Sequence, residues 1–420
     1  MFILYDFIAL IFTIFYLPVY LFRRKFHPGF GQRLGILPKN LDLKRPIWLH
    51  AVSVGEVAAI KGLLAQLRKL YPQEQFIIST VTPTGNRVAK GLIQDKDLVL
   101  YLPLDFSFIV RGVIKRINPR LFVLAETEIW PNLISCFNKA QVPIVVVNGR
   151  ISDRSFKSYR RIKFFLKAII SKVSLFLVQT ERDAQRLLAL GALKEKVRVS
   201  GNMKFDIAVQ AGGDYADFRR KLMLGGEEKL LVCGSTHPGE ENIILCAYAE
   251  ILKNFPSLKI LIAPRHPERS GQVIQIVSRY GFRSVLVSKL PLKCDSCIPE
   301  PVFILDTIGE LIPYYAAADI VFVGGSLVKK GGHNILEPAS FAKPIISGEF
   351  MFNFKDIAEL FKENNAALFV RSAEGLKAQV ENLLADVHLR CELGERARDL
   401  ILKNRGAAEE SAKLIKGLLN

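Results

Sequence analysis

Acidic side chains follow two of the predicted strands, in positions where they could take up a proton or stabilise positive charge. In HAVSVGE, residues 50–56, an apolar run ends near Val52 and Glu56 opens the next helical segment. In LFVLAETEIWPN, Glu126 and Glu128 follow another apolar run. Because the carboxyl ends of parallel strands meet at one edge of a sheet, these segments predict a polar pocket. Structural alternatives remain: Glu56 could complement a helix dipole, and one of the other two acids could bind backbone donors.

The second half of the chain carries residues suited to binding an anion. Loops rich in glycine or basic residues follow three predicted strands, at 234–236, 264–269 and 324–326. In GGHNILEPA, residues 331–339, glycines precede a helix expected to begin near Asn334, whose amides would point at a phosphate. Glu337 could bind a ribose hydroxyl or be an ordinary first-turn acid. Neither G-x-G-x-x-G nor a P-loop lysine motif occurs, which argues against dinucleotide and ATP sites.

Short apolar runs alternate with helical segments along the chain, and this pattern predicts parallel sheets covered on both faces. The runs lie at 46–52, 76–81, 98–102, 121–125, 143–148, 175–179, 230–233, 258–263, 302–305, 320–323, 344–347 and 367–370. A polar break at 210–217 separates two such series, and 420 residues suit two domains. We therefore expect an α/β protein with two doubly wound Rossmann-like domains facing a cleft. The domains are predicted at 26–209 and 218–420, with the last helix able to pack back on the first.

The amino terminus has the composition of a membrane anchor. Sixteen uncharged residues run from Phe7 to Phe22, and Arg23, Arg24 and Lys25 follow at once. The apolar run is short for a membrane span, so residues 1–25 are predicted either to cross the bilayer or to lie in its plane. The basic cluster places the rest of the chain in the cytoplasm. A cleaved signal peptide is less consistent, because a basic n-region and a small-residue cleavage site are lacking.

A second basic segment, residues 154–172, has seven basic residues and no acidic one. Apolar residues recur at helical spacing, which predicts one amphipathic helix over the segment. The apolar stripe of this helix consists of Phe156, Tyr159, Ile162, Leu166, Ile169 and Ile170. This helix could bind an anionic membrane through Arg160, Arg161 and Lys163, or it could pack its apolar stripe on the core. The formal charge of +18 likewise requires a negatively charged partner.

Six cysteines are scattered over the chain, which indicates a reducing compartment. The one C-x-x-C pair, Cys294 and Cys297, has no second pair that would complete a zinc site. We predict neither a metal site nor a cofactor.

The sequence resembles the 3-deoxy-D-manno-octulosonic acid (Kdo) transferases of lipopolysaccharide synthesis over nearly its whole length. Nine blocks in order carry the resemblance: HAVSVGE, STVTPTGN, YLPLD, ETEIWPNLI, NGRIS, GNMKFD, APRHPER, DTIGEL and VGGSLVKKGGHNILEPA. The family has the two-domain glycosyltransferase B fold, an amino-terminal anchor in the bacterial inner membrane and a cytoplasmic catalytic body. The resemblance implies inverting transfer of Kdo from CMP-Kdo to the glucosamine disaccharide of a lipid A precursor, lipid IVA.

The resemblance also assigns site residues. It implies that Glu56 is the general base, and that Glu126 and Lys204 stabilise the transition state. The family's CMP contacts map to Pro264, Arg265, Ile308, Gly309, Glu310, Asn334, Ile335, Leu336 and Glu337. The implied partners are the lipid A precursor and anionic lipids of the inner membrane.

Two other functions fit parts of the sequence less well. A nucleotide-sugar epimerase would share the fold and the nucleotide site, but such enzymes are soluble, so the predicted anchor counts against this alternative. A membrane-tethered nucleic-acid binder would use the positive charge. That charge is interleaved with acids in the carboxy-terminal half, so no nucleic-acid partner is predicted.

Overall fold

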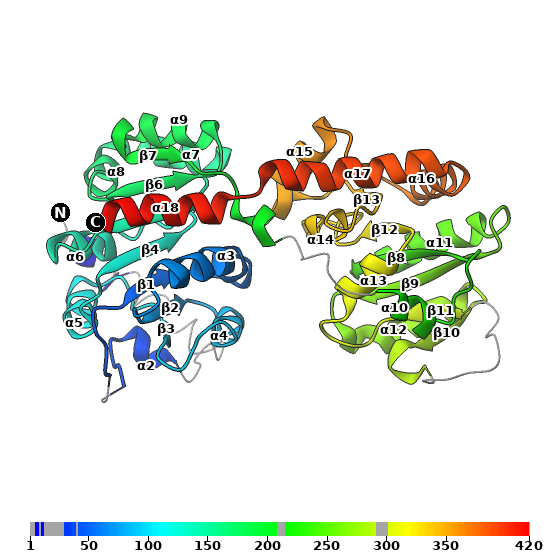
Figure 1. Ribbon diagram of the computed structural model, residues 1–420, viewed down its shortest axis with the longest axis horizontal. Helices are drawn as coiled ribbons and strands as arrows, with labels where there is room; N and C mark the ends of the chain where they lie inside the picture. The colour runs from blue at the N-terminus through cyan, green and yellow to red at the C-terminus, as the bar shows by residue number, and fades with distance from the viewer. Residues whose placement is uncertain are drawn as a thin grey trace. The chain divides into compact units, whose positions relative to one another are not determined.

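The computed structural model describes residues 5–7, 10–11, 29–38, 41–207, 215–290 and 301–419. The chain divides into two compact units (Figure 1), and each is described by itself. The first unit runs to Ile207 and includes the segment from Asn404, whereas the second is Ala208–Lys403. The sequence analysis put the residues from 404 onward in the second domain while allowing the last helix to pack back on the first; in the structure they belong to the first unit. There α18 (Ala407–Leu419) packs against α3 (Val54–Leu70).

The described residues of the first unit form a seven-stranded parallel sheet. In spatial order its strands are β3 (Leu98–Tyr101), β2 (Phe76–Thr80), β1 (Ile47–His50), β4 (Leu121–Ala125), β5 (Ile144–Gly149), β6 (Leu175–Val178) and β7 (Val197–Val199). Its helices, besides α3 and α18, are α2 (Phe30–Arg33), α4 (Pro83–Lys90), α5 (Ser107–Ile117), α6 (Pro131–Lys139), α7 (Asp153–Arg161), α8 (Lys163–Ile170), α9 (Glu181–Leu190) and the 3-10 helices η1 (Lys194–Lys196) and η2 (Met203–Ile207).

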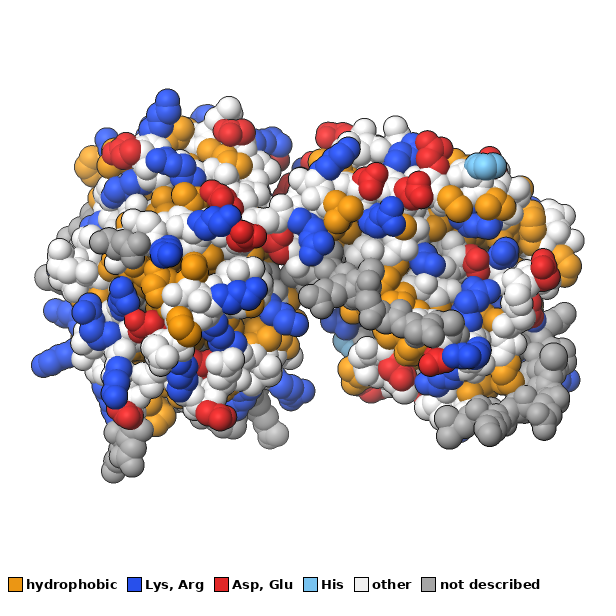
Figure 2. All heavy atoms as spheres, in the orientation of Figure 1, with side chains coloured by type: hydrophobic (Ala, Val, Ile, Leu, Met, Phe, Trp, Pro, Cys, Tyr) orange, Lys and Arg blue, Asp and Glu red, His pale blue; other side chains and the backbone are white. Residues whose placement is uncertain are grey.

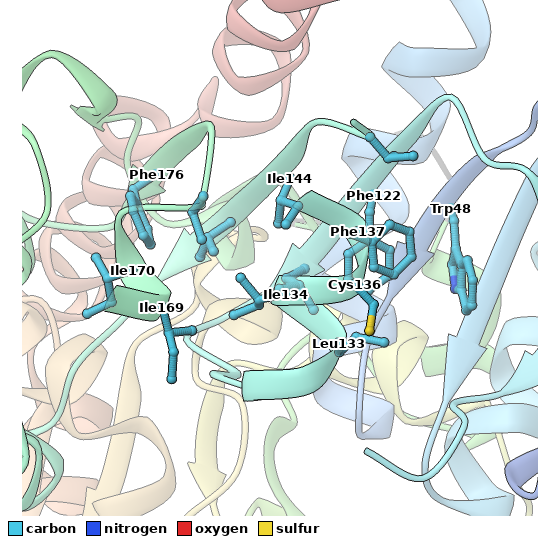
Figure 3. Packing of buried hydrophobic residues seen from close by; sticks show 14 of the residues in the cluster. Trp48, Phe122, Leu133, Ile134, Cys136, Phe137, Ile144, Ile169, Ile170 and Phe176 are labelled. Carbon is cyan, nitrogen blue, oxygen red and sulfur yellow. The ribbon is translucent and has the colours of Figure 1, made fainter. Parts of the chain in front are cut away.

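Aliphatic and aromatic side chains together fill the core on one face of this sheet (Figure 3). The rings of Phe122 and Phe137 stack with centroids 4.0 Å apart, and Trp48 meets both edge-on. All three side chains are fully buried. Burying a side chain of this size stabilises the fold by about 2 to 3 kcal/mol, so β1, β4 and α6 are held firmly relative to one another.

The order of the strands reverses between β1 and β4. From β1 the chain adds β2 and β3 on one side, and it then returns to add β4 through β7 on the other. In open α/β sheets, ligands bind outside the carboxyl ends of the strands at such a reversal. The segments that follow β1 and β4 are the two that carry the predicted catalytic acids.

The second unit has a sheet of the same kind, again with seven parallel strands among the described residues. In spatial order they are β10 (Arg283–Leu286), β11 (Pro301–Ile304), β9 (Leu258–Pro264), β8 (Lys229–Thr236), β12 (Ile320–Val323), β13 (Ile345–Gly348) and β14 (Leu368–Val370). The helices are α10 (Ala216–Lys221), α11 (Glu240–Ile251), α12 (Ser270–Arg279), α13 (Leu311–Ala317), α14 (Leu336–Ala339), α15 (Lys355–Glu363), α16 (Ala373–Ala385) and α17 (Val387–Asn404), with 3-10 helices η3 (Pro267–Arg269), η4 (Val287–Lys289) and η5 (Phe352–Phe354). Here the order reverses between β8 and β12.

The basic segment at 154–172 differs from its prediction. Instead of one helix there are two, α7 and α8, because the backbone leaves the helical conformation at Ile162. The side chain of Ile162 is exposed, although the predicted stripe includes it. Phe156 and Tyr159 pack against the core, and Leu166 is buried. The apolar stripe therefore serves mainly to attach both helices to the sheet.

The predicted anchor at 1–25 lies largely outside the described residues. No helix within the described ranges is both long and apolar enough to cross a bilayer. The Cys294 and Cys297 pair also lies outside the described residues. On the face shown in Figure 2, Lys and Arg side chains are spread over both units with acidic side chains among them.

Candidate active site

Glu56 lies in the first turn of α3, beside the carboxyl end of β1. Its Oε2 accepts a hydrogen bond from the Val52 amide at 2.7 Å, and its Oε1 accepts one from the Ser53 hydroxyl at 3.0 Å. The side chain is only 9% exposed. Burial raises the pKa of the Glu56 carboxyl to about 7, with the Val52 hydrogen bond opposing and the nearby Glu126 charge adding to the rise. A carboxyl with such a pKa is suited to accept a proton near neutral pH.

The loop that holds Glu56 is packed against the start of α4. The Thr82 hydroxyl caps α4 by accepting from the Gly85 amide, and it also donates to the Val52 carbonyl. A Cβ at Gly85 would lie 2.8 Å from the Thr82 hydroxyl and 3.4 Å from the Ser53 backbone. The glycine in the STVTPTGN block is therefore needed for the close approach of α4 to this loop.

Glu126 directly follows β4 in a left-handed conformation, with a φ of 57°. The strand thus ends at Ala125, before Glu126. A non-glycine residue in this region is strained, and such residues concentrate at functional sites. A backbone hydrogen bond to β5 holds this conformation: the Glu126 amide donates to the Val147 carbonyl at 2.8 Å.

Lys204, in η2, lies next to Glu126, with Nζ 3.6 Å from its Oε1. The buried side chain of Asn148, at the end of β5, positions η2 by accepting from the Met203 amide at 3.0 Å. Burial raises the pKa of the Glu128 carboxyl, and the charge of Glu126 adds to the rise. The structure therefore brings Glu56, Glu126 and Lys204 to one edge of the first sheet, at the reversal in strand order.

The second unit has a pocket of about 260 Å³ at the carboxyl ends of β8, β9 and β11. Among its lining residues are four of the predicted nucleotide contacts, namely Pro264, Arg265, Ile308 and Gly309. The other five predicted contacts do not line it. Glu310 instead accepts a hydrogen bond from Thr307 and pairs with Lys221 at 3.5 Å.

The remaining four, residues 334–337, lie at the start of α14. This helix has four residues and begins at Leu336 rather than near Asn334, and its dipole is small. The Asn334 side chain bonds within the segment, accepting from the Leu336 amide at 3.2 Å and donating to Glu337 at 3.1 Å. That the amides of this segment hold a phosphate stays a prediction.

The Gly324-Gly325-Ser326 loop already holds an anion, and that anion is the side chain of Glu240. Four backbone amides donate to this carboxylate at 2.7 to 2.9 Å, namely those of His237, Gly325, Ser326 and Leu327. Glu240 is fully buried. The prediction that this loop is free to bind a substrate anion is wrong, because Glu240 occupies the reversal between β8 and β12.

Three histidines gather outside this carboxylate, and the sequence analysis did not single them out. The Nε2 atoms of His237 and His333 lie 2.9 Å apart, with the rings nearly parallel. His266, which lines the pocket, has its ring centroid 6.3 Å from that of His237. The signal was present in the sequence, since each of the blocks GSTHPGE, APRHPER and GGHNILEPA contains one histidine after a strand. Within the described ranges, no three His, Cys, Asp or Glu side chains are arranged as metal ligands.

Arg160, Arg161 and Lys163 are exposed around the break between α7 and α8. Phe164 follows them and is 94% exposed. The described residues place no acidic side chain within salt-bridge distance of the three cations. A bare aromatic ring among cations suits an interface between water and anionic lipid.

The two parallel sheets, each with polar residues at its reversal in strand order, define a two-unit α/β protein with doubly wound sheets. Solved structures with this fold include a glycosyltransferase from Rickettsia africae, at 14% identity, TM-score 0.58, and coverage of 90% of this chain and 99% of that one. Another is the UDP-GlcNAc 2-epimerase of Neisseria meningitidis bound to UDP-GlcNAc, at 12% identity, TM-score 0.59, and coverage of 88% and 100%. At these identities the similarity shows the glycosyltransferase B type of fold and no more.

Sequence comparison identifies the family. The family described as 3-Deoxy-D-manno-octulosonic-acid transferase (kdotransferase) matches residues 28–207. The 3-deoxy-D-manno-octulosonic acid transferase of Haemophilus influenzae is 36% identical over 379 residues, which cover 89% of this chain and 87% of that protein. The chain belongs to the Kdo transferase family and is a glycosyltransferase.

Proposed function

We propose that the protein transfers Kdo from CMP-Kdo to the glucosamine disaccharide of a lipid A precursor, lipid IVA, with inversion at the anomeric carbon. Family membership and the similarity to the Haemophilus influenzae transferase support the reaction. An epimerase activity has only the shared fold in its favour. The proposal assigns the acceptor and the base to the first unit and the nucleotide to the second.

The observation that carries the proposal is the environment of Glu56. An inverting transfer needs one group to take the proton of the acceptor hydroxyl while the leaving group departs from the opposite face of the sugar. Burial raises the pKa of the Glu56 carboxyl to about 7, and hydrogen bonds from Val52 and Ser53 fix its orientation. The carboxylate is therefore proposed to act as the general base.

Glu126 and Lys204 are proposed to stabilise the transition state. Their ion pair, 3.6 Å long, lies at the same edge of the sheet as Glu56. The anomeric carbon gains positive charge as the leaving group departs, and a carboxylate stabilises that charge. A lysine can neutralise either the carboxylate of Kdo or the departing phosphate.

The pocket in the second unit is proposed to hold CMP. Arg265 contributes a guanidinium group that can bind a phosphate through two parallel hydrogen bonds. Ile308 and Gly309 form another wall, while Glu310 and residues 334–337 are proposed to contact the nucleotide from the pocket's surroundings. The proposed reaction uses no metal and no cofactor.

Membrane attachment is proposed to bring the enzyme to its acceptor. A lipid A precursor carries phosphates at the membrane surface and acyl chains within the bilayer, so the catalytic body must dock there. Arg160, Arg161, Lys163 and Phe164 have the charge and exposure for docking on anionic lipid. With residues 1–25 as an anchor, the protein is proposed to act at the cytoplasmic side of the bacterial inner membrane.

The test is a direct measurement of the product. Purified protein is incubated with a tetraacylated lipid A precursor and CMP-Kdo made in situ, and the lipid is weighed by mass spectrometry. We expect a mass increase of one or more Kdo units, and the size of the increase counts them. The Glu56→Gln variant is expected to yield none. A folded wild-type protein that binds CMP but leaves the lipid mass unchanged would refute the proposal.

A further inference from the structure

His237 and His333 form a hydrogen-bonded pair at the reversal in strand order of the second sheet. Their Nε2 atoms are 2.9 Å apart and their rings are 3° from parallel. The pair rests on the backbone of Gly325, where a Cβ would lie 2.9 Å from the His333 ring and 3.3 Å from the His237 ring. Since the Gly325 amide is itself bound to Glu240, both rings are supported by a buried and fully occupied hydrogen-bond network.

This geometry limits where protons can lie. Two N–H groups cannot point at each other over 2.9 Å, so one Nε2 donates and the other accepts. The pair can still take up one further proton, on the Nδ1 atom of the donating ring. It then carries a single positive charge shared across the hydrogen bond, and both Nδ1 atoms become donors.

The groups that face the pair are predominantly basic. Arg265 and His266 follow β9, Arg269 closes η3, and Lys330 precedes the glycines at 331 and 332. Burial, together with the charges of Arg265 and the other two histidines, lowers the pKa of His333 to about 4. Burial and the nearby cations lower the pKa of His237 as well. The carboxylate of Glu240, which accepts from the His237 amide, is already bound by four amides. Positive groups are thus concentrated around two neutral rings.

We infer that the His237–His333 pair takes up a proton when a phosphate monoester binds beside it, and that it thereby stabilises the leaving group of the transfer reaction. This inference rests on the proposed function. In the transfer, the acceptor oxygen bonds to the anomeric carbon, and the bond from that carbon to the phosphate oxygen breaks. The electron pair stays on the phosphate, and the hydroxyl proton passes to Glu56.

The charge of the phosphate changes in this step. It goes from about one negative charge as a diester to about two as a monoester near neutral pH. An adjacent anion raises the pKa of an imidazole, because it favours the charged form. The pair therefore gains its positive charge as the phosphate gains negative charge. His266 lines the pocket, and its ring centroid is 6.3 Å from that of His237, so the pair lies close to the pocket.

Calorimetry of CMP binding tests the inference. Titrations at pH 7 in two buffers of different ionisation enthalpy measure the protons taken up on binding. We expect uptake of roughly half a proton or more per CMP in the wild type, and little with cytidine, which lacks the phosphate. His237→Gln and His333→Gln should each abolish the uptake and weaken CMP binding by about tenfold. His388→Gln, which replaces an exposed histidine of the same unit, is the matched control and should behave as wild type.

The outcomes separate the two proposals. If CMP binds the wild type without proton uptake, or if uptake persists in both histidine variants, the inference is wrong while the proposed function stands. If cytidine causes the same uptake as CMP, the phosphate is not the cause and the inference is again wrong. A folded protein that does not bind CMP at all would overturn both proposals.

Discussion

Replacing Glu56 by glutamine should stabilise the first unit while it abolishes turnover. The pKa of Glu56 rises from 4.5 in the unfolded chain to about 7 in the fold, chiefly through burial. Each pKa unit corresponds to about 1.4 kcal/mol, so the ionised carboxylate costs the folded unit about 3 kcal/mol. Glutamine has nearly the same shape and no charge, and the Val52 amide can still donate to its oxygen.

The sign of the effect depends on pH in a defined way. A carboxyl group whose pKa is raised by folding is neutral in both the folded and the unfolded chain well below pH 4.5. At such pH it therefore does not change the free energy of unfolding. As the pH rises toward 7 the unfolded chain loses its proton first, and the wild type becomes progressively less stable. The Glu56→Gln variant should match the wild type near pH 4 and exceed it by about 3 kcal/mol above pH 8.

Urea unfolding followed by tryptophan fluorescence measures this difference. The chain has two tryptophans, Trp48 and Trp130, and both lie in the first unit, so the signal reports on that unit alone. Glu181→Gln is the matched control, because Glu181 is an exposed first-turn carboxylate of α9 and should show no stabilisation that grows with pH. If Glu56→Gln were less stable than wild type above pH 8, the assignment of a buried carboxyl with a raised pKa would be refuted. Turnover should fall by about 100-fold or more, as for loss of a general base.

Lys204→Met should lower kcat by about 100-fold without changing CMP affinity, because it removes a fixed charge from the first unit alone. Glu240→Gln should destabilise the second unit by about 2 kcal/mol, measured by thermal unfolding, since an amide offers one acceptor oxygen where four backbone amides converge. Replacing Arg160, Arg161 and Lys163 together by alanine should lower the affinity for anionic vesicles, measured by co-sedimentation, by about 100-fold, because each cation contributes about 1 kcal/mol of binding free energy. The affinity for CMP should not change.

Each of these three expectations has a clear contrary result. Full turnover in Lys204→Met would show that Lys204 is not a catalytic residue. An unchanged melting temperature in Glu240→Gln would mean that the four amides find other acceptors. Vesicle binding equal to wild type in the triple variant would show that α7 and α8 do not face the membrane.

The interior of both sheets could be predicted from the sequence because their strands are buried on both faces. β4, for example, is an uninterrupted apolar run whose predicted and observed bounds agree. The two strands that escaped prediction are β7 and β10, which lie at sheet edges and have only one neighbour each. Each of these two edge strands also carries an arginine, Arg198 or Arg283, which the partly solvated edge tolerates, so neither forms the uninterrupted apolar run that predicted the edge strands β3 and β14.

The residues of the candidate site could be predicted where a reactive side chain comes directly after a buried strand in the sequence. Glu56 and Glu126 could be found in this way, since each comes within a few residues of a buried run. Glu240 could not, because its partners at Gly325 and beyond lie about 85 residues away and are backbone amides, which any sequence provides. The His237–His333 pair was missed for a related reason. A contact between two single histidines on different loops leaves no periodic pattern in the sequence.

The return of α18 to the first unit affects the order in which the protein can fold during synthesis. Ala408, Ala412 and Ile415 of α18 belong to the same buried cluster as α3, and Asp206 binds the amides of Gly406 and Ala408. These residues leave the ribosome only after the whole second unit has been made. The second unit is continuous in sequence and can fold as soon as it is made, whereas the cluster that α18 completes in the first unit stays open until synthesis ends. The nascent first unit is therefore the part of the chain that stays incomplete, and exposed to aggregation, for longest.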